Sequence, residues 1–89
     1  MTSKTTGSFR TALAALPPEI RLQAREAYKL FKQNPHHPSL RFRQVHPTEP
    51  IFSARVTRGY RAVGIRVGDT IIWFWIGSHA GYERLLSNL

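Results

Sequence analysis

The sequence has 89 residues, of which 42% are hydrophobic and none is cysteine, so it can bury one modest core but can form neither a disulfide nor a thiolate zinc site. Thirteen Lys and Arg against five Asp and Glu leave a formal net charge of +8, a balance typical of proteins that bind nucleic acid or an acidic protein. The longest apolar stretch, residues 71–76, is too short to span a membrane, and the polar start of the chain is unlike a signal peptide. We therefore expect one domain over residues 1–89, located in the cytoplasm and without a membrane partner.

The first half of the chain predicts two helices. Residues 1–7 are polar and make a poor strand, so we expect them to be frayed. Ser8 can cap a first helix that the Pro17-Pro18 pair ends, and Pro18 suits the first position of a second helix that runs to about Gln33. Apolar residues recur at helical spacing along this second helix and predict its core face: Ile20, Ala24, Ala27 and Phe31.

The second half predicts a sheet followed by a short helix. Alternating or apolar runs indicate strands over residues 40–45, 51–56, 60–67 and 70–76, and Gly68-Asp69 is a tight hairpin signal. Residues 78–89 predict a terminal helix anchored by Leu85, Leu86 and Leu89. We therefore expect an α+β fold, in which an N-terminal helix hairpin packs on one face of a four-stranded antiparallel sheet and a short C-terminal helix follows.

Arginine is concentrated in the predicted sheet. Between Leu40 and Val67 the only acid is Glu49, whereas this stretch holds six arginines: Arg41, Arg43, Arg55, Arg58, Arg61 and Arg66. The guanidinium group is planar and presents paired donors to phosphate oxygens. On the sheet face that the helices leave open, these arginines can bind RNA phosphates, although plain surface charge would give the same composition. We expect general RNA contacts from Arg41, Arg43, Arg58 and Arg66.

Three segments carry a family resemblance: "LPPEIRLQAREAYKLF", "NPHHPSLRFRQV" and "SARVTRGYRAVGIRVGDTIIWFWIGSHAGYERLL". Together they cover roughly residues 9 to 87, and the chain resembles the RelE/ParE superfamily of toxins from bacterial type II toxin–antitoxin systems. Many members open with a strand before the helices, so the poor strand at residues 1–7 indicates a shortened or absent first strand here. The resemblance implies the RelE/ParE toxin fold and a cognate antitoxin as partner.

The resemblance also implies a reaction. RelE-like members cut mRNA in the ribosomal A site without a metal, by attack of a 2′-hydroxyl on the adjacent phosphate. Arg61, in "GYRAV", matches the motif in which such toxins carry a phosphate-binding arginine. Arg55 lies near the position where some members carry a catalytic lysine, but arginine does not deprotonate and cannot act as a base. All three lysines lie in the N-terminal half, so another residue must move the proton.

His79 is the candidate for that proton transfer, because histidine exchanges protons near neutral pH. It follows Ser78, a plausible N-cap, and a helix N-terminus favours neutral imidazole and attracts phosphate. Tyr82 lies three residues on, on the same helix face. Pairing across the Gly68-Asp69 hairpin would bring Arg61 opposite about residue 76, close to where His79 emerges. We expect Arg61, His79, Tyr82 and Arg55 to form the catalytic site.

Other candidate sites are weaker. Trp73 and Trp75 are expected on one strand face, where core packing is a commoner role than stacking on bases. The histidines at 36, 37 and 46 have poor metal-ligand spacing, so we expect neither a metal site nor another cofactor.

Three functions remain open at this stage. The first is a ribosome-dependent endoribonuclease, with mRNA and the ribosome as partners. The second is a ParE-like toxin that inhibits DNA gyrase, and the third is a non-catalytic relic that binds RNA or an antitoxin. A proton-transfer pair beside Arg61 favours the first, and the missing lysine favours the others. In each case a cognate antitoxin is expected to cover the arginine face with an acidic segment.

Overall fold

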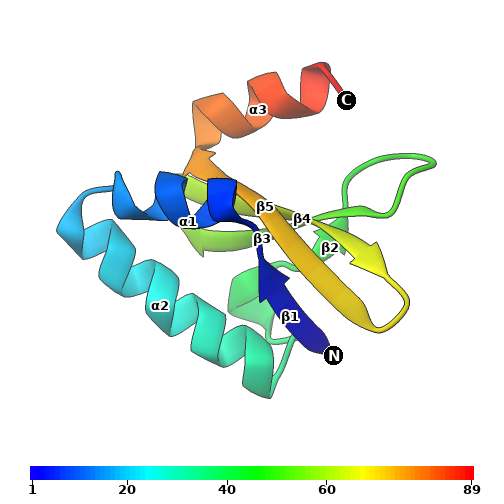
Figure 1. Ribbon diagram of the computed structural model, residues 1–89, viewed down its shortest axis with the longest axis horizontal. Helices are drawn as coiled ribbons and strands as arrows, with labels where there is room; N and C mark the ends of the chain where they lie inside the picture. Colours follow the sequence, from blue (N-terminus) through cyan, green and yellow to red (C-terminus); the bar gives the residue numbers. More distant parts are fainter.

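The computed structural model describes residues 1–89 and contains three α-helices and one five-stranded mixed sheet. The strand order is β1-β5-β4-β3-β2 (Figure 1). In chain order the elements are β1 (Thr2–Thr5), α1 (Gly7–Ala14), α2 (Pro18–Gln33), the 3₁₀ turn η1 (Pro38–Leu40), β2 (Arg43–Gln44), β3 (Ile51–Thr57), β4 (Tyr60–Val67), β5 (Thr70–Ser78) and α3 (His79–Ser87). The α+β class is confirmed, but the sheet has one strand more than predicted and is not purely antiparallel.

The first residues form an edge strand, so the prediction that residues 1–7 are frayed is wrong. β1 runs parallel to β5, with Thr2 paired to Thr70 and Thr5 to Trp73. The Trp73 indole Nε1 donates a hydrogen bond to Ser3 Oγ over 3.0 Å, which ties the new strand to the core. β1 stabilises the sheet with backbone hydrogen bonds and contributes no apolar side chain, so a hydrophobic pattern could not predict it.

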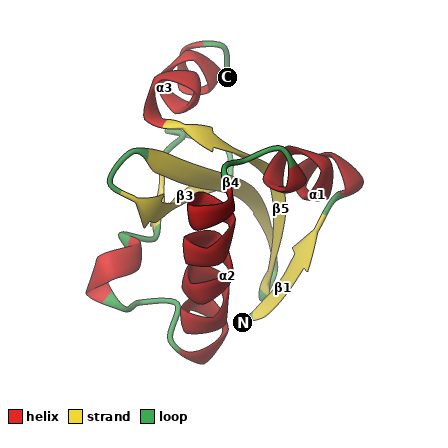
Figure 2. Cartoon of the chain, turned by 90° about the vertical axis from the view of Figure 1, so that its left-hand side faces the viewer, coloured by secondary structure: helices red, strands yellow, loops and turns green.

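Helices α1 and α2 cover the same face of the sheet but diverge across it (Figure 2). The N-cap of α1 is Thr6, whose Oγ1 accepts from the Phe9 amide over 3.1 Å, so the predicted Ser8 cap is wrong. Pro18 begins α2 as predicted. Because α1 packs on β5 and α2 packs on β3, the two helices do not form the closely packed hairpin that was expected. Phe9 and Phe31 bring them into one core with Trp73.

Most of the strand predicted at residues 40–45 is absent. The 3₁₀ turn η1 ends at Leu40, which is 2% exposed and belongs to the core. Arg41 follows with a left-handed backbone (φ 45°), which interrupts an extended chain. Only β2 pairs with β3, through Arg43 opposite Ser53 and Gln44 opposite Phe52. The early turn places Arg41 beside the end of the sheet rather than on a strand.

The three long strands agree closely with their predicted limits, except for an irregularity in β5. Val63 pairs with Trp75 and Gly64 with Trp73, so Phe74 is an extra residue in the ladder. The bulge sends Trp73 into the core under α1 and α2 and Trp75 toward α3, so the prediction of one shared face is wrong. A Cβ on Gly64 would lie 2.9 Å from the Trp73 ring, so this close approach requires glycine.

Helix α3 packs on the second face of the sheet. Ser78 is its N-cap, as predicted, and its Oγ accepts from the Gly81 amide over 3.2 Å. Tyr82 is the buried anchor of α3, with Leu85 and Leu86 packed around it, whereas Leu89 is 45% exposed and does not anchor the helix. None of the helices combines the length and the apolar character needed to cross a membrane. The second face is therefore covered at one end only, next to the start of α3.

Candidate active site

A cleft of about 310 Å³ opens beside the N-terminus of α3 and brings together six of the eight predicted site residues. Arg55 and Arg61 come from paired positions of β3 and β4, and His79 and Tyr82 come from the first turn of α3. Arg41 and Arg43 close the cleft from the segment around β2. The complete lining is Arg41, Phe42, Arg43, Ser53, Arg55, Arg61, His79 and Tyr82.

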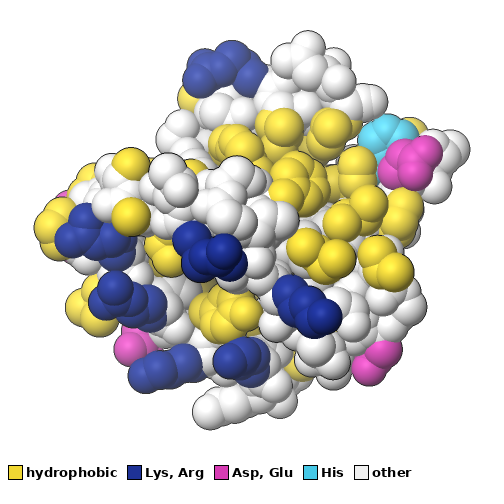
Figure 3. Space-filling model, viewed as in Figure 1, with side chains coloured by type: hydrophobic (Ala, Val, Ile, Leu, Met, Phe, Trp, Pro, Cys, Tyr) yellow, Lys and Arg dark blue, Asp and Glu magenta, His cyan; other side chains and the backbone are white.

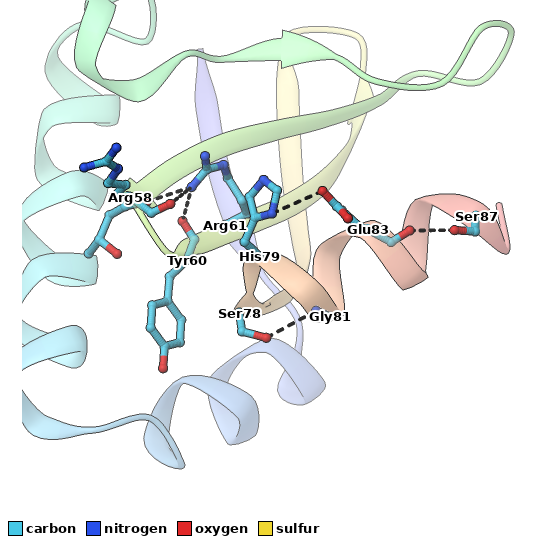
Figure 4. Close-up of polar contacts among 9 residues, drawn as sticks. Arg58, Tyr60, Arg61, Ser78, His79, Gly81, Glu83 and Ser87 are labelled. Atoms are coloured by element: carbon cyan, nitrogen blue, oxygen red, sulfur yellow. Dashed lines mark hydrogen bonds and ion pairs between the residues drawn. The ribbon is translucent and has the colours of Figure 1, made fainter.

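Arg61 is held by the turn between β3 and β4. Its Nη1 donates to the carbonyl oxygens of Thr57, Tyr60 and Arg58 at 2.7, 3.0 and 3.2 Å (Figure 4). Its Nε and Nη2 have no partner in the protein, so one edge of the guanidinium remains available for an anion. Arg61 pairs with Gly77 of β5, one residue from the position expected from the hairpin.

The cleft has four arginines and no carboxylate among its lining residues. Arg55 lies directly across the ladder from Arg61, and like charges in that arrangement destabilise a sheet. Partial burial, followed by the charge of Arg55, lowers the pKa of Arg61, while Arg41 and Arg43 act in the same direction. Arginine nevertheless remains charged at neutral pH, so the cleft is a site of unbalanced positive charge suited to an anion.

His79 begins α3 at the rim of the cleft. Its backbone amide donates to the Gly59 carbonyl over 2.8 Å, which fixes the start of the helix against the β3–β4 turn. Its Nδ1 lies 3.3 Å from Glu83 Oε1, as Figure 4 shows, and its Nε2 has no partner in the protein. The side chain is 46% exposed, so this second nitrogen can meet a ligand.

Tyr82 lies behind His79 and is 5% exposed. Its hydroxyl donates to the buried Ser53 Oγ over 3.1 Å, and its ring centroid lies 5.8 Å from that of His79. The Tyr82 ring therefore packs beside the His79 imidazole, and the Tyr82 hydroxyl is already bonded to Ser53. Neither Ser53 nor Glu83 was predicted as a site residue. The i,i+4 spacing of Glu83 from His79 could have identified the second, but no local pattern indicates the first.

Two predicted RNA contacts lie outside the cleft. Arg66 stands on the opposite sheet face, with its guanidinium 5.9 Å from the Phe52 ring centroid and 4.0 Å from Asp69 Oδ1. Arg58 is exposed in the β3–β4 turn, where its carbonyl supports Arg61. The strand alternation of β4 sends Arg61 and Arg66 to opposite faces, because they are five positions apart.

Two of the other three histidines organise loops with their side chains. His37 Nδ1 accepts from the Ser39 amide over 3.2 Å and caps the 3₁₀ turn. His46 Nδ1 accepts from the amides of Thr48 and Glu49, at 3.2 and 2.9 Å. No three side chains of His, Cys, Asp or Glu gather in an arrangement suited to a metal ion.

A second surface, unlike the arginine-lined cleft, is apolar. In Figure 3, hydrophobic side chains gather below α3 and over β5, whereas most visible Lys and Arg side chains lie over α1, α2 and β1. Phe74, Leu85 and Leu86, which pack against the core cluster around Tyr82, are only partly buried. Exposed apolar surface of this kind is typical of a protein-binding site.

Comparison with known proteins identifies relatives of this fold. YafQ from E. coli strain BL21(DE3) superposes with a TM-score of 0.71 at 10% identity, covering 90% of this chain and 94% of YafQ. The RelB-RelE antitoxin-toxin complex from Methanococcus jannaschii contains a chain with a TM-score of 0.69 at 18% identity, covering 92% and 96%. The YoeB/ParE toxin from Agrobacterium tumefaciens gives 0.67 at 14% identity, covering 89% and 99%.

Comparison of the sequence identifies a family. Among curated proteins, none matches the chain. The family model of the ParE-like toxin domain matches residues 18–84, a segment that includes α2, the four strands β2 to β5 and the His79–Glu83 turn of α3. The chain therefore belongs to the ParE-like toxin domain family, within the RelE/ParE superfamily of toxins.

Proposed function

We propose that the protein is the toxin of a toxin–antitoxin pair and that it cleaves ribosome-bound mRNA in the cytoplasm. The observation that supports this function best is the cleft itself, in which four arginines without a carboxylate surround a histidine at a helix N-terminus. The arginines suit a polyanion, and the histidine supplies a group that can accept a proton beside it. A protein that acts only by binding would not need this second feature.

The proposed reaction uses the groups of the cleft as follows. The free edge of Arg61 binds the scissile phosphate with two donors. Nε2 of His79 accepts the proton of the 2′-hydroxyl, whose oxygen attacks the phosphorus. The bond to the 5′-oxygen breaks, and that oxygen takes a proton from water. The products are a 2′,3′-cyclic phosphate and a 5′-hydroxyl, and the imidazolium returns its proton to solvent.

The other cleft residues support this step. Arg55 adds charge stabilisation to the crowded phosphorane, whose negative charge exceeds that of the bound substrate. Arg41 and Arg43 hold neighbouring phosphates of the strand, and Arg58 and Arg66 make at most peripheral contacts from outside the cleft. Tyr82 acts as a positioning residue, since its buried hydroxyl is bonded to Ser53 and its ring supports His79.

The proposed antitoxin would use both surfaces of the molecule. Fold relatives include chains described as RelB-RelE and RelE-RelB complexes, so a bound antitoxin is compatible with this architecture. An acidic segment would neutralise the arginines of the cleft and exclude RNA, and an apolar segment would cover the hydrophobic surface beside α3. Removing the antitoxin would then free the cleft.

Primer extension on a reporter mRNA, with and without purified ribosomes, tests the proposal. The wild-type protein should produce new 5′ ends only when ribosomes are present, and Arg61→Ala and His79→Ala should reduce cleavage by about 10²–10³-fold and about 10²–10⁴-fold. Arg25→Ala, an exposed position on α2, serves as the control. Wild-type protein that arrests growth while mRNA stays intact and gyrase is inhibited would refute the nuclease and support the gyrase alternative.

A further inference from the structure

Glu83 is the one carboxylate in contact with the candidate base. It lies one helical turn after His79 on α3, with Oε1 3.3 Å from the imidazole Nδ1 (Figure 4). It is not among the residues that line the cleft. Its side chain meets the site through the ion pair with His79.

The ion pair favours one position for the ring proton. An ionised carboxylate attracts an N–H group and repels a nitrogen lone pair, so it favours the proton on the nitrogen that faces it, Nδ1. With the proton on Nδ1, neutral His79 keeps its lone pair on Nε2, the nitrogen that has no partner in the protein. The same arrangement of a carboxylate behind a histidine orients bases in many hydrolytic enzymes.

The arginines around His79 make its ion pair with Glu83 the one nearby source of negative charge. Proton uptake by His79 would place an imidazolium beside a cleft lined by four arginines and no carboxylate. The charged groups that share the cleft with His79 from other segments are Arg41, Arg43, Arg55 and Arg61, and Tyr82 lies beside it on α3 itself. The other acids lie on α2, in the β2–β3 loop and in the β4–β5 turn: Glu19, Glu26, Glu49 and Asp69. Only Glu83 balances the positive charge that forms when His79 accepts a proton.

We infer that Glu83 is a positioning residue that keeps the His79 proton on Nδ1 and stabilises the ring after Nε2 has accepted a second proton. The inference rests on the proposed function, because it assigns His79 the role of base. Treated only as an exposed i,i+4 pair, the same contact would stabilise α3 slightly and would leave the rate of the chemical step unchanged.

Glu83→Ala separates these two accounts. The position is exposed and alanine favours helix, so the variant should fold. We expect kcat for ribosome-bound mRNA to fall roughly tenfold with little change in KM, at the low end of the effect of outer-shell carboxylates because this pair is open to solvent. Glu19→Ala, which removes the same charge from the exposed first turn of α2, should change neither.

Long-range ¹H–¹⁵N NMR of the full chain reads the imidazole tautomer without any activity measurement. Neutral His79 should carry its proton on Nδ1 in the wild type, and Glu83→Ala should shift the population toward the Nε2 proton. An unchanged tautomer in Glu83→Ala, or a loss of kcat matched by Glu19→Ala, would overturn the inference. Wild-type protein without cleavage would instead refute the proposed nuclease, and the NMR comparison would still decide whether Glu83 positions the ring.

Discussion

Replacing Arg55 by glutamine should stabilise the fold while it weakens the site. Arg55 faces Arg61 directly across the β3–β4 ladder, and it makes no ion pair with any carboxylate. Like charges in opposite ladder positions cost about 0.2–1 kcal/mol. Both side chains are only partly buried, so solvent screens the repulsion and we take about 0.5 kcal/mol as the expected gain.

Thermal unfolding followed by circular dichroism measures this gain. For a domain of this size, about 1 kcal/mol corresponds to a Tm change of about 4–8 °C, so Arg55→Gln should raise Tm by about 2–4 °C at low ionic strength. Raising the salt concentration to about 1 M shortens the screening length to about 3 Å and should remove most of the difference. Arg25→Gln on the exposed face of α2 makes the same change in net charge without a facing arginine.

Cleavage should change in the opposite direction. Loss of one charge-stabilising group in the cleft should slow the reaction by about 10²-fold, although the fold is more stable. A lower Tm for Arg55→Gln, or an equal gain in Arg25→Gln, would show that the two arginines do not repel each other. Higher stability with unchanged cleavage would remove Arg55 from the catalytic site and leave Arg61 as the one arginine proposed to act on the scissile phosphate.

Three further substitutions test the architecture around the cleft by thermal or urea unfolding. Tyr82→Phe should cost about 1–2 kcal/mol, because it leaves the buried Ser53 hydroxyl without a partner, and unchanged stability would show that this bond is dispensable. Gly64→Ala should cost about 1–3 kcal/mol, since its Cβ would lie 2.9 Å from both the Ile72 carbonyl oxygen and the Trp73 ring, and a stable variant would place the bulge elsewhere. Ser3→Ala should cost about 1 kcal/mol through loss of the Trp73 indole partner, and amide exchange of β1 should accelerate with it; equal protection in both proteins would show that this side-chain bond does not help to hold β1 on the sheet.

Hydrophobic alternation and turn residues correctly predicted the strands that bury apolar side chains and are joined by tight turns. β4 begins at Tyr60 and ends at Val67 as expected, since Gly68 with φ 61° makes the tight turn that fixes its pairing with β5. β1 could not be predicted in this way, because its four residues are polar and its stability comes from the free backbone groups of β5. The β5 bulge is equally invisible in the sequence, because a run of apolar residues fits either register.

In the candidate site, too, contacts within one hairpin could be predicted from the sequence, whereas contacts between distant segments could not. Arg61 and His79 could be placed together because antiparallel pairing across one hairpin is simple to count, and the error was a single residue. The contact between Tyr82 and Ser53 joins α3 to β3 across 29 positions, so it depends on a packing arrangement that no local spacing encodes. Arg41 reaches the cleft through a left-handed turn rather than the strand predicted for it.

The absence of lysine from the lining of the cleft explains why the proposed chemistry depends on α3. A strand lysine could combine charge and proton transfer in one side chain, whereas Arg55 and Arg61 supply charge alone. The proton acceptor must then come from another element, and its distance from the phosphate must be fixed by contacts between the two. The hydrogen bond from the His79 amide to Gly59 does this, because Gly59 lies in the same turn whose carbonyls hold Arg61. The proposed phosphate ligand Arg61 and the proposed base His79 are therefore both held by one turn, and a change in that turn would displace both.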